Sequence, residues 1–349
     1  MDVLSLIKSP IIDELEDFKN LFDHSLSSSN PLLTDVIGHL QQRNGKMMRP
    51  ILVLLIAKLY GKVSAQTLHA AVSLELLHTA SLVHDDVVDE SAERRGQLSV
   101  NAIFNNKVAV LTGDFLLATC LVQASKTKNH GIIDVVSKLG QDLAEGELLQ
   151  LSNINNTEFS ESVYFDVINK KTAALFASCT KAAALSAQVD NEKVELARLF
   201  GEYIGICFQI KDDIFDYFDN ADIGKPTGND MFEGKLTLPV LFVLNNGAGE
   251  EIKRLAIKVK QRLASHQEIS DLVSFTKDNG GILYAQIEMN KKKEKALDLL
   301  SLMPDTEVDP GSNFSCPVIY FSCTVNCKPL LAKALRFNVL ISKHKCGEP

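Results

Sequence analysis

The chain has 349 residues with a formal net charge of -8, and 46% of its residues are hydrophobic. This acidic balance argues against nucleic acid as a partner, and the apolar content is ample for a sizeable core. The sequence does not open with a basic region followed by a long apolar run, and its apolar runs are shorter than the roughly 20 residues of a membrane span. The seven cysteines show no convincing metal-type spacing, so we expect reduced thiols. We therefore expect a cytoplasmic protein without a transmembrane segment.

Helices make up most of the expected elements, taken in chain order. Apolar residues recur every three or four positions in residues 50–60, 66–89, 106–124, 131–151, 161–187 and 191–218. Clusters of glycine, proline, asparagine and serine separate some of these stretches, most clearly in residues 219–229. Helices that are apolar on several faces belong in the core of a large bundle. The sequence therefore predicts an all-α fold, with one large helical domain over residues 1–308.

The last part of the chain, residues 309–349, differs in composition from the rest. It holds four of the seven cysteines and five Lys or Arg against two acids, whereas residues 1–308 hold 31 against 42. Residues 318–325 are more strand-like than anything before them. We treat residues 309–349 as an atypical C-terminal tail, foreign to the helical body, and leave open whether it is ordered.

One acidic pattern occurs twice in the chain. Residues 85–89 read Asp-Asp-Val-Val-Asp, and residues 212–216 read Asp-Asp-Ile-Phe-Asp. In a helix, the first and fifth residues of each copy lie one turn apart on one face. Two such faces turned toward each other would gather six carboxylates, whose repulsion hard cations such as Mg²⁺ would neutralise. Because the flanking residues are apolar, a solvated acidic surface explains the pattern less well than metal ions that hold a diphosphate.

Basic residues accompany both motifs. Lys46 and Arg49 are three apart near an expected helix start, where phosphate binds well. Arg suits two-point phosphate binding and Lys a point-charge contact. Further candidates are Arg94, Arg95, Lys170, Lys171 with Thr172, Lys225 and Lys235. Any one of them alone is more often a surface charge, but together they suffice for two diphosphates, one bound through metal and one bound directly.

These motifs resemble those of the trans-isoprenyl diphosphate synthases, in particular the long-chain, octaprenyl-type polyprenyl diphosphate synthases. The matching blocks follow the family's order through most of residues 30–300, at 45–50, 78–96, 113–114, 171–172, 208–216, 224–230 and 234–239. The resemblance implies an isoprenoid synthase fold with a central active-site cavity, and a homodimer. Two departures are that Met47 and Met48 stand where the family often has a basic residue, and that the tail does not match the family's usual C-terminal helix.

The resemblance also implies roles for individual residues. Asp85, Asp89 and Asp212 would hold about three Mg²⁺ ions. Asp216 would belong to the same metal site, and Asp86 and Asp213 would support it, partly through water. The allylic diphosphate would lie on these metals among Arg94, Lys171, Thr172, Gln209, Lys225 and Lys235, with Lys171 catalytic like the aspartates. Isopentenyl diphosphate would lie against Gly45, Lys46, Arg49, His78 and Arg95, although His78 could equally be a structural histidine.

Product length would be set one turn before Asp85. Ala80 and Ser81 are both small, and bulky aromatic residues at these positions stop the chain early in the family. Small residues leave a passage toward Leu76 and Leu77, so we expect a product longer than roughly C20, in the range of about C30–C50. The alternative is that both are ordinary packing residues and another helix blocks the passage.

The expected activity is that of a prenyltransferase. The allylic diphosphate would ionise, isopentenyl diphosphate would attack the cation, and loss of a proton would complete each addition to an all-trans chain. The nearest alternative is a short-chain farnesyl or geranylgeranyl diphosphate synthase. A class I terpene cyclase would usually replace the second Asp motif, and a non-catalytic partner subunit would tend to lose both. A di-iron carboxylate bundle would use the Glu-x-x-His pattern of Glu75 and His78, which has no second copy.

Overall fold

The structure is a computed structural model, and it describes residues 3–42, 47–94, 96–153, 156, 158–218 and 227–304. The predicted tail, 309–349, lies outside the described residues, as do Gly45, Lys46, Arg95 and Lys225. The chain divides into two compact units. Unit 1 comprises residues 1–140, 175–201 and 298–349, and unit 2 comprises residues 141–174 and 202–297.

Unit 1 contains helices and one short hairpin of strands β1 and β2. Its complete elements are α1 (Val3–Lys8), η1 (Ser9–Ile11), α2 (Ile12–Ser25), α3 (Pro31–Gln41), α4 (Met48–Leu59), α5 (Ala65–Val88), β1 (Glu93–Arg94), β2 (Gln97–Leu98), α6 (Val100–Phe104) and α7 (Asn106–Lys126). Helix α10 (Ala174–Ser186) belongs to it except for its first residue. Three further helices, α8 (His130–Ser152), α11 (Asn191–Phe215) and α16 (Gly281–Ser301), continue across the division between the units.

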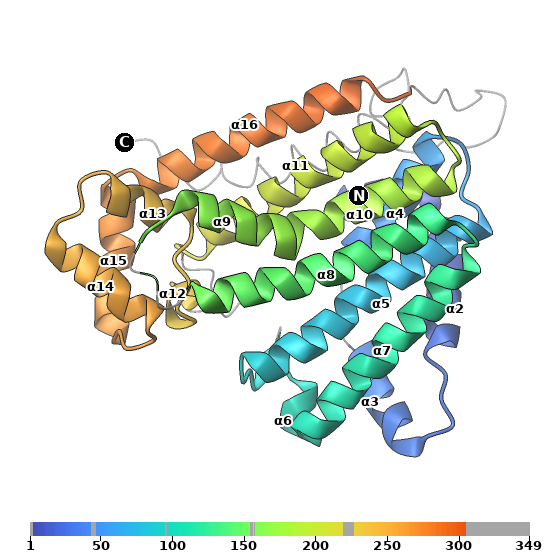
Figure 1. Cartoon of the computed structure of the whole chain (residues 1–349), viewed down its shortest axis with the longest axis horizontal. Helices are drawn as coiled ribbons and strands as arrows, with labels where there is room; N and C mark the ends of the chain where they lie inside the picture. The colour runs from blue at the N-terminus through green and yellow to red at the C-terminus, as the bar shows by residue number, and fades with distance from the viewer. Residues whose placement is uncertain are drawn as a thin grey trace. The chain divides into compact units, whose positions relative to one another are not determined.

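Helix α5 forms the centre of unit 1 and packs along α7, beside which it runs in Figure 1. It begins with a capping box, in which the side chains of Ser64 and Thr67 satisfy each other's backbone N–H groups. Helix α4 packs on α5 and is apolar on nearly every face, so residues 50–57 are all buried. A helix of this kind is stable only inside a helical core.

Helix α7 is the one helix among the described residues that is long and apolar enough to cross a membrane. The core helices of soluble proteins can have the same length and apolar composition. Its buried face also carries a polar network: the Gln123 side-chain oxygen accepts from His69 Nδ1 at 2.8 Å, and its amide nitrogen donates to Ser25 Oγ at 2.7 Å. The absence of a transmembrane segment therefore stays a prediction.

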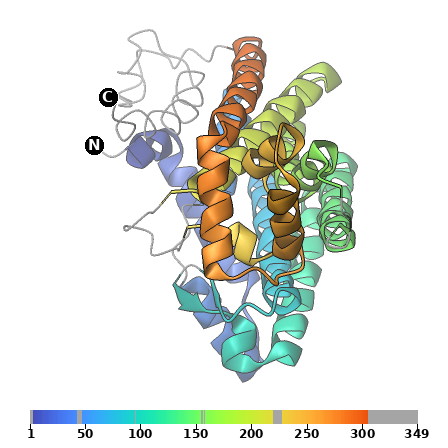
Figure 2. The ribbon, with the colours of Figure 1, turned by 90° about the vertical axis from the view of Figure 1, so that its left-hand side faces the viewer.

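The described part of unit 2 contains helices joined by turns and loops, and no strand. Besides the shared helices it contains α9 (Glu161–Ile168), the π turn η2 (Asn169–Ala173), α12 (Asn229–Phe232), α13 (Leu238–Asn245), α14 (Glu250–Lys260) and α15 (His266–Asp278). Helices α14 and α15 lie side by side in both views (Figures 1 and 2) and enclose an apolar cluster with Tyr217 and Met231. A second cluster joins α9, α11, α13 and α16, with Ile210 and Leu238 fully buried.

The all-α prediction is confirmed, and each stretch of helical period corresponds to helix in the structure. The expected helix over residues 161–187 is divided by the π turn, which falls on the predicted site residues Lys171 and Thr172. A π turn inserts one extra residue into a helix and is frequent at functional sites. Neither this turn nor the β1–β2 hairpin was predicted from the sequence.

Candidate active site

Each Asp motif occupies the C-terminal end of a long helix. The first ends α5, where the Asp89 backbone N–H donates to the Asp85 carbonyl at 2.8 Å. The second ends α11, where the Asp216 N–H donates to the Asp212 carbonyl at 3.2 Å. Both observations confirm the predicted one-turn spacing. Because the first motif lies in unit 1 and the second in unit 2, the six-carboxylate cage stays a prediction.

In the first motif, Asp86 is buried and paired with Arg94. The Arg94 Nε atom donates to Asp86 Oδ1 at 2.5 Å, from strand β1 of the hairpin that follows α5. Asn101 supports the same turn by donating to the carbonyls of Asp86 and Ser91, each at 3.2 Å. Asp86 Oδ2 is buried and has no hydrogen-bond partner among the residues that the structure describes. A buried carboxylate oxygen of this kind needs a water or a cation.

In the second motif, Asp213 is the buried member and accepts two side-chain hydrogen bonds. The Tyr164 hydroxyl donates to Asp213 Oδ2 at 2.5 Å, and Gln209 Nε2 donates to Oδ1 at 2.8 Å. The Gln209 carbonyl in turn accepts from Thr172 Oγ1 at 2.7 Å. The structure thus connects three residues that the sequence predicted separately, Thr172, Gln209 and Asp213, through one chain of hydrogen bonds.

Asp216 of the same motif holds the segment that follows. Its two carboxylate oxygens accept the backbone N–H groups of Asn229, at 3.0 Å, and Asp230, at 3.1 Å, at the start of α12. Its carbonyl accepts from Gly228 N at 2.8 Å. Gly228 has φ +82°, and a Cβ there would come within 2.9 Å of Ile269 Cγ2, so only glycine fits this turn without strain. Asp216 therefore has a structural task besides any contact with metal.

Negative charge is concentrated around the second motif. Burial raises the pKa of Asp213, and the neighbouring carboxylates of Asp212 and Asp216 raise it further. Burial likewise raises the pKa of Asp230, with Asp213 and Asp216 adding to the effect. This repulsion favours protonation or a bound cation. Within the described part of each unit, however, no three or more His, Cys, Asp or Glu side chains are grouped so as to hold a metal ion.

The π turn brings its lysines against α8. Lys171 pairs with Glu147 and also donates to Gln150 Oε1 at 3.2 Å, while Lys170 donates to Glu145 Oε2 at 2.5 Å. The hydrogen bond to Glu145 raises the pKa of Lys170. Lys171, predicted to bind diphosphate, thus has a carboxylate partner that a diphosphate would have to replace.

The other predicted residues of unit 1 lie on α4 and α5. Arg49 is in the first turn of α4. Burial raises the pKa of the Cys179 thiol to about 12, while the charge of Arg49 lowers that pKa and the charge of Glu75 raises it. His78 is half-buried on α5, and its carbonyl accepts from Ser81 Oγ at 2.9 Å. Of the predicted chain-length residues, Leu77 and Ala80 are buried, with Ala80 fully so, and Ser81 is partly accessible.

In unit 2, Lys235 follows α12. Its ammonium group donates to Glu233 Oε2 at 2.5 Å, and its backbone N–H donates to the Asp230 carbonyl at 2.8 Å. It therefore lies beside the segment that Asp216 holds.

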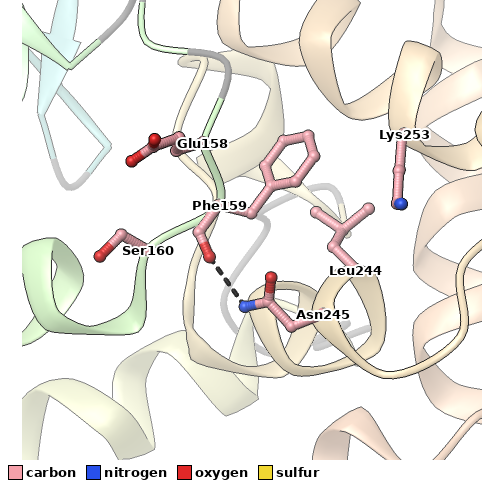
Figure 3. A pocket seen from close by; sticks show the side chains of 6 residues that line it. All are labelled: Glu158, Phe159, Ser160, Leu244, Asn245 and Lys253. Atoms are coloured by element: carbon pink, nitrogen blue, oxygen red, sulfur yellow. Dashed lines mark hydrogen bonds between the residues drawn. The ribbon is translucent and has the colours of Figure 1, made fainter.

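A surface pocket of about 490 Å³ in unit 2 contains none of the predicted site residues. Its lining residues, shown in Figure 3, are Glu158, Phe159, Ser160, Leu244, Asn245 and Lys253. The Asn245 side chain donates to the Phe159 carbonyl at 2.8 Å and ties α13 to the segment before α9. We assign this pocket no function.

Sequence reasoning missed several residues that position the predicted ones. Tyr164 binds Asp213, Glu147 and Gln150 bind Lys171, and Gly146 allows α8 to approach the π turn. The run from Glu145 to Gln150 contains two acids and a glycine within an apolar helix, a signal that could have drawn attention to it.

Known proteins are similar to this chain over most of its length. The family model described as polyprenyl synthetase matches residues 30–276. An octaprenyl diphosphate synthase of Haemophilus influenzae is 34% identical over 81% of this chain and 86% of its own length. An all-trans-nonaprenyl-diphosphate synthase of Rhodobacter capsulatus, described as geranyl-diphosphate specific, is 35% identical over 86% of this chain and 92% of its own.

Solved structures agree on the fold. A decaprenyl diphosphate synthase from Rhodobacter capsulatus has a TM-score of 0.85 at 29% identity, covering 96% of this chain and 98% of its own. A geranylgeranyl pyrophosphate synthase from Bacteroides thetaiotaomicron has a TM-score of 0.81 at 57% identity, covering 97% of this chain and 100% of its own. These matches confirm the predicted isoprenoid synthase fold and argue against a di-iron carboxylate protein. By sequence and by fold, the chain belongs to the polyprenyl synthetase family.

Proposed function

We propose that this chain is a Mg²⁺-dependent trans-polyprenyl diphosphate synthase. It extends farnesyl diphosphate, or a similar allylic diphosphate, with successive isopentenyl diphosphates and releases diphosphate at each step. The observation that carries this proposal is the pair of complete Asp motifs, each at the end of a long helix, in a member of this family. A non-catalytic subunit would have no use for both motifs.

The residues present suit a hard divalent cation. Oxygen ligands are what Mg²⁺ prefers, and the buried Asp86 Oδ2 atom and the carboxylates crowded around Asp213 both favour positive charge nearby. Asp85, Asp89 and Asp212 would hold about three ions, and Asp216 would contribute where its bonds to α12 allow. When bound, Mg²⁺ would supply positive charge to the departing diphosphate.

The chain's own side chains account for binding and orientation. Lys171 and Arg94 would leave their carboxylate partners, Glu147 and Asp86, to bind oxygens of the allylic diphosphate as its C–O bond ionises. Thr172 and Gln209 would flank the reacting end, held by their mutual hydrogen bond. Isopentenyl diphosphate would bind Arg49 and His78, together with Gly45, Lys46 and Arg95 outside the described residues. The released diphosphate is the proposed acceptor of the proton lost after condensation.

We propose a long product. The curated relatives are named octaprenyl, nonaprenyl and solanesyl diphosphate synthases, which favours chain elongation well beyond two additions. The similar solved structure from Bacteroides thetaiotaomicron is named a geranylgeranyl pyrophosphate synthase, whose product is shorter. The short-chain alternative is therefore included in the test below. Small side chains at Ala80 and Ser81 support the long product.

We also propose that the chain forms a homodimer and is located in the cytoplasm. Helix α7 leaves apolar side chains exposed at helical spacing, with Leu111 67%, Leu121 59% and Val122 52% accessible. A second copy that covers this stripe would remove apolar surface from water. Sedimentation of the purified chain would test the dimer, and the location stays a prediction.

One experiment tests the proposed function as a whole. Purified chain is incubated with farnesyl diphosphate, isopentenyl diphosphate and Mg²⁺, and the products are separated by chain length. We expect products longer than roughly C20 that disappear when a chelator removes the metal. Products that stop at C15 or C20 would support the short-chain alternative, and no product with any allylic primer would overturn the enzymatic proposal.

A further inference from the structure

Tyr164 is a buried polar residue that the proposed function does not yet use. It lies on α9, one turn after Glu161, and only 8% of its surface is accessible. Its hydroxyl donates to Asp213 Oδ2 at 2.5 Å. Burial raises the pKa of Tyr164, and the charge on Asp213 adds to this effect, so the phenol keeps its proton and acts as a donor.

The hydrogen bond from Tyr164 is the first of a directed chain of hydrogen bonds, in which each donor is fixed by the one before. Gln209 turns its amide NH₂ toward Asp213 and donates to Oδ1 at 2.8 Å. The Gln209 carbonyl then faces Thr172 and requires the hydroxyl of Thr172 to donate its single proton to it. As a consequence, Thr172 has only lone pairs to offer any group on its other side.

The chain joins three separate elements of unit 2. Tyr164 comes from α9, Thr172 from the π turn, and Gln209 and Asp213 from successive turns of α11. Without the Tyr164 hydroxyl, Asp213 Oδ2 would lose its only side-chain donor among the described contacts and, with Asp213 only 2% accessible, could not obtain full hydration. The carboxylate would then be free to rotate, and the orientation of Gln209 would no longer be fixed.

We propose that Tyr164 is a positioning residue for the second Asp motif: its hydroxyl fixes the Asp213 carboxylate and, through Gln209, the direction of the Thr172 hydroxyl. This inference rests on the proposed role of residues 212–216 in holding the metal and the allylic diphosphate. Tyr164 itself touches neither ligand. It acts as outer partners of metal ligands do, by holding the groups that make contact.

The test uses Tyr164→Phe, which removes one oxygen and keeps the ring. The chain offers a matched control in Tyr284→Phe, because Tyr284 also donates to a carboxylate on α9, Glu161 Oε2, at 2.7 Å, and no hydrogen bond among the described residues joins it to an Asp of either motif. Mutating a residue that hydrogen-bonds to a metal ligand typically lowers metal affinity or activity by about 10- to 100-fold. We expect Tyr164→Phe to raise the Mg²⁺ concentration for half-maximal activity and to lower kcat within that range, with the KM for isopentenyl diphosphate unchanged. Tyr284→Phe should stay within about twofold of the parent in each quantity.

A readout independent of turnover separates positioning from mere stability. Mn²⁺ binding in the presence of inorganic diphosphate, followed by electron paramagnetic resonance, should weaken in Tyr164→Phe and not in Tyr284→Phe. Thermal unfolding of both variants shows whether each is folded at the assay temperature. A folded Tyr164→Phe with parental Mn²⁺ binding and Mg²⁺ dependence overturns the inference, as does an equal loss in the control. If the parent chain itself shows no metal-dependent elongation, the proposed function fails instead.

A double substitution tests the directed chain. Tyr164→Phe and Gln209→Leu remove the two side-chain donors to one carboxylate, so their effects on Mn²⁺ binding should not add. Additive losses would mean that the two residues act independently and would overturn the shared role of Asp213.

Discussion

Gly146 lies directly against the side chain of Lys171. A Cβ built on Gly146 would come within 2.8 Å of Lys171 Cγ and 2.9 Å of Lys170 Cβ, so the helix and the π turn can approach this closely only because residue 146 has no side chain. The same approach brings Glu147 into its ion pair with Lys171. The position of the proposed diphosphate-binding lysine therefore depends on a glycine of another helix.

We predict that Gly146→Ala displaces Lys171 and lowers kcat/KM for the allylic diphosphate by roughly 10- to 100-fold. Gly140→Ala is the matched control on the same helix, since a Cβ there would only reach ordinary contact with Leu77 Cδ1, at 3.9 Å. The control should keep its activity and gain about 0.5–1 kcal/mol of unfolding free energy from helix propensity. Steady-state kinetics and urea unfolding check both, and equal activities in the two variants would refute the proposed dependence.

Asp85→Ala and Asp212→Ala should each lower turnover by orders of magnitude while the chain stays folded. The reason is the loss of a proposed metal ligand, and Asp212 is exposed, so its removal disturbs no packing. Asp278→Ala removes an exposed carboxylate of α15 and serves as the control. Near-normal activity in either motif variant, with unfolding curves that match the parent, would contradict the metal role.

Asp216→Ala should differ from Asp212→Ala in stability. It removes the acceptor of two backbone N–H groups at the start of α12, which we expect to reduce the unfolding free energy by about 1–3 kcal/mol. Denaturant unfolding at neutral pH measures the difference between the two variants. If the unfolding free energies of Asp216→Ala and Asp212→Ala are equal, the hydrogen bonds from α12 to Asp216 do not contribute to stability.

Ser81→Phe should shorten the product without unfolding the chain. Ser81 is partly accessible, whereas Ala80 is fully buried, so Ala80→Phe adds overpacking of about 1–3 kcal/mol to any effect on length. Product chromatography and thermal unfolding separate the two effects. If Ser81→Phe and a folded Ala80→Phe both make products of parental length, the proposed passage does not run past these residues.

The thiols of Cys120, Cys179 and Cys207 should resist alkylation in the folded chain. Burial raises the pKa of each to about 12, so the reactive thiolate is nearly absent at pH 8 and forms only as the pH approaches that value. Iodoacetamide labelling followed by peptide mass spectrometry should find these three modified in urea and not in buffer. Labelling of Cys120 or Cys179 in buffer at pH 8 would contradict their burial, and labelling of Cys207, which is only partly buried, would contradict its raised pKa.

Much of the fold and part of the site could be predicted from the sequence. Residues 66–89 show helical period and apolar composition, both local properties, so α5 and the one-turn spacing of Asp85 and Asp89 were predictable. The partners of the site residues were not. Whether Tyr164 meets Asp213, 49 positions away, or Glu147 meets Lys171 depends on how helices pack, which no local pattern encodes.

The proposed metal role of Asp216 shows the same limit within a motif. Its place in the Asp-x-x-x-Asp spacing indicates a ligand, yet its oxygens accept N–H groups from residues 229 and 230. Such a contact requires the chain to return to the end of α11 after residues 219–226. The sequence shows a glycine- and proline-containing loop there but not where it leads.

The location of both Asp motifs at helix C-termini has a thermodynamic consequence. The last carbonyl groups of α5 and α11 already give those ends a partial negative charge, and acidic side chains there are unfavourable for the helices themselves. The metal-free chain thus carries electrostatic strain at two helix ends. A divalent cation that binds only the folded state would relieve that strain and raise the melting temperature with its concentration, so the proposed metal would act as a stabilising ligand before any substrate arrives.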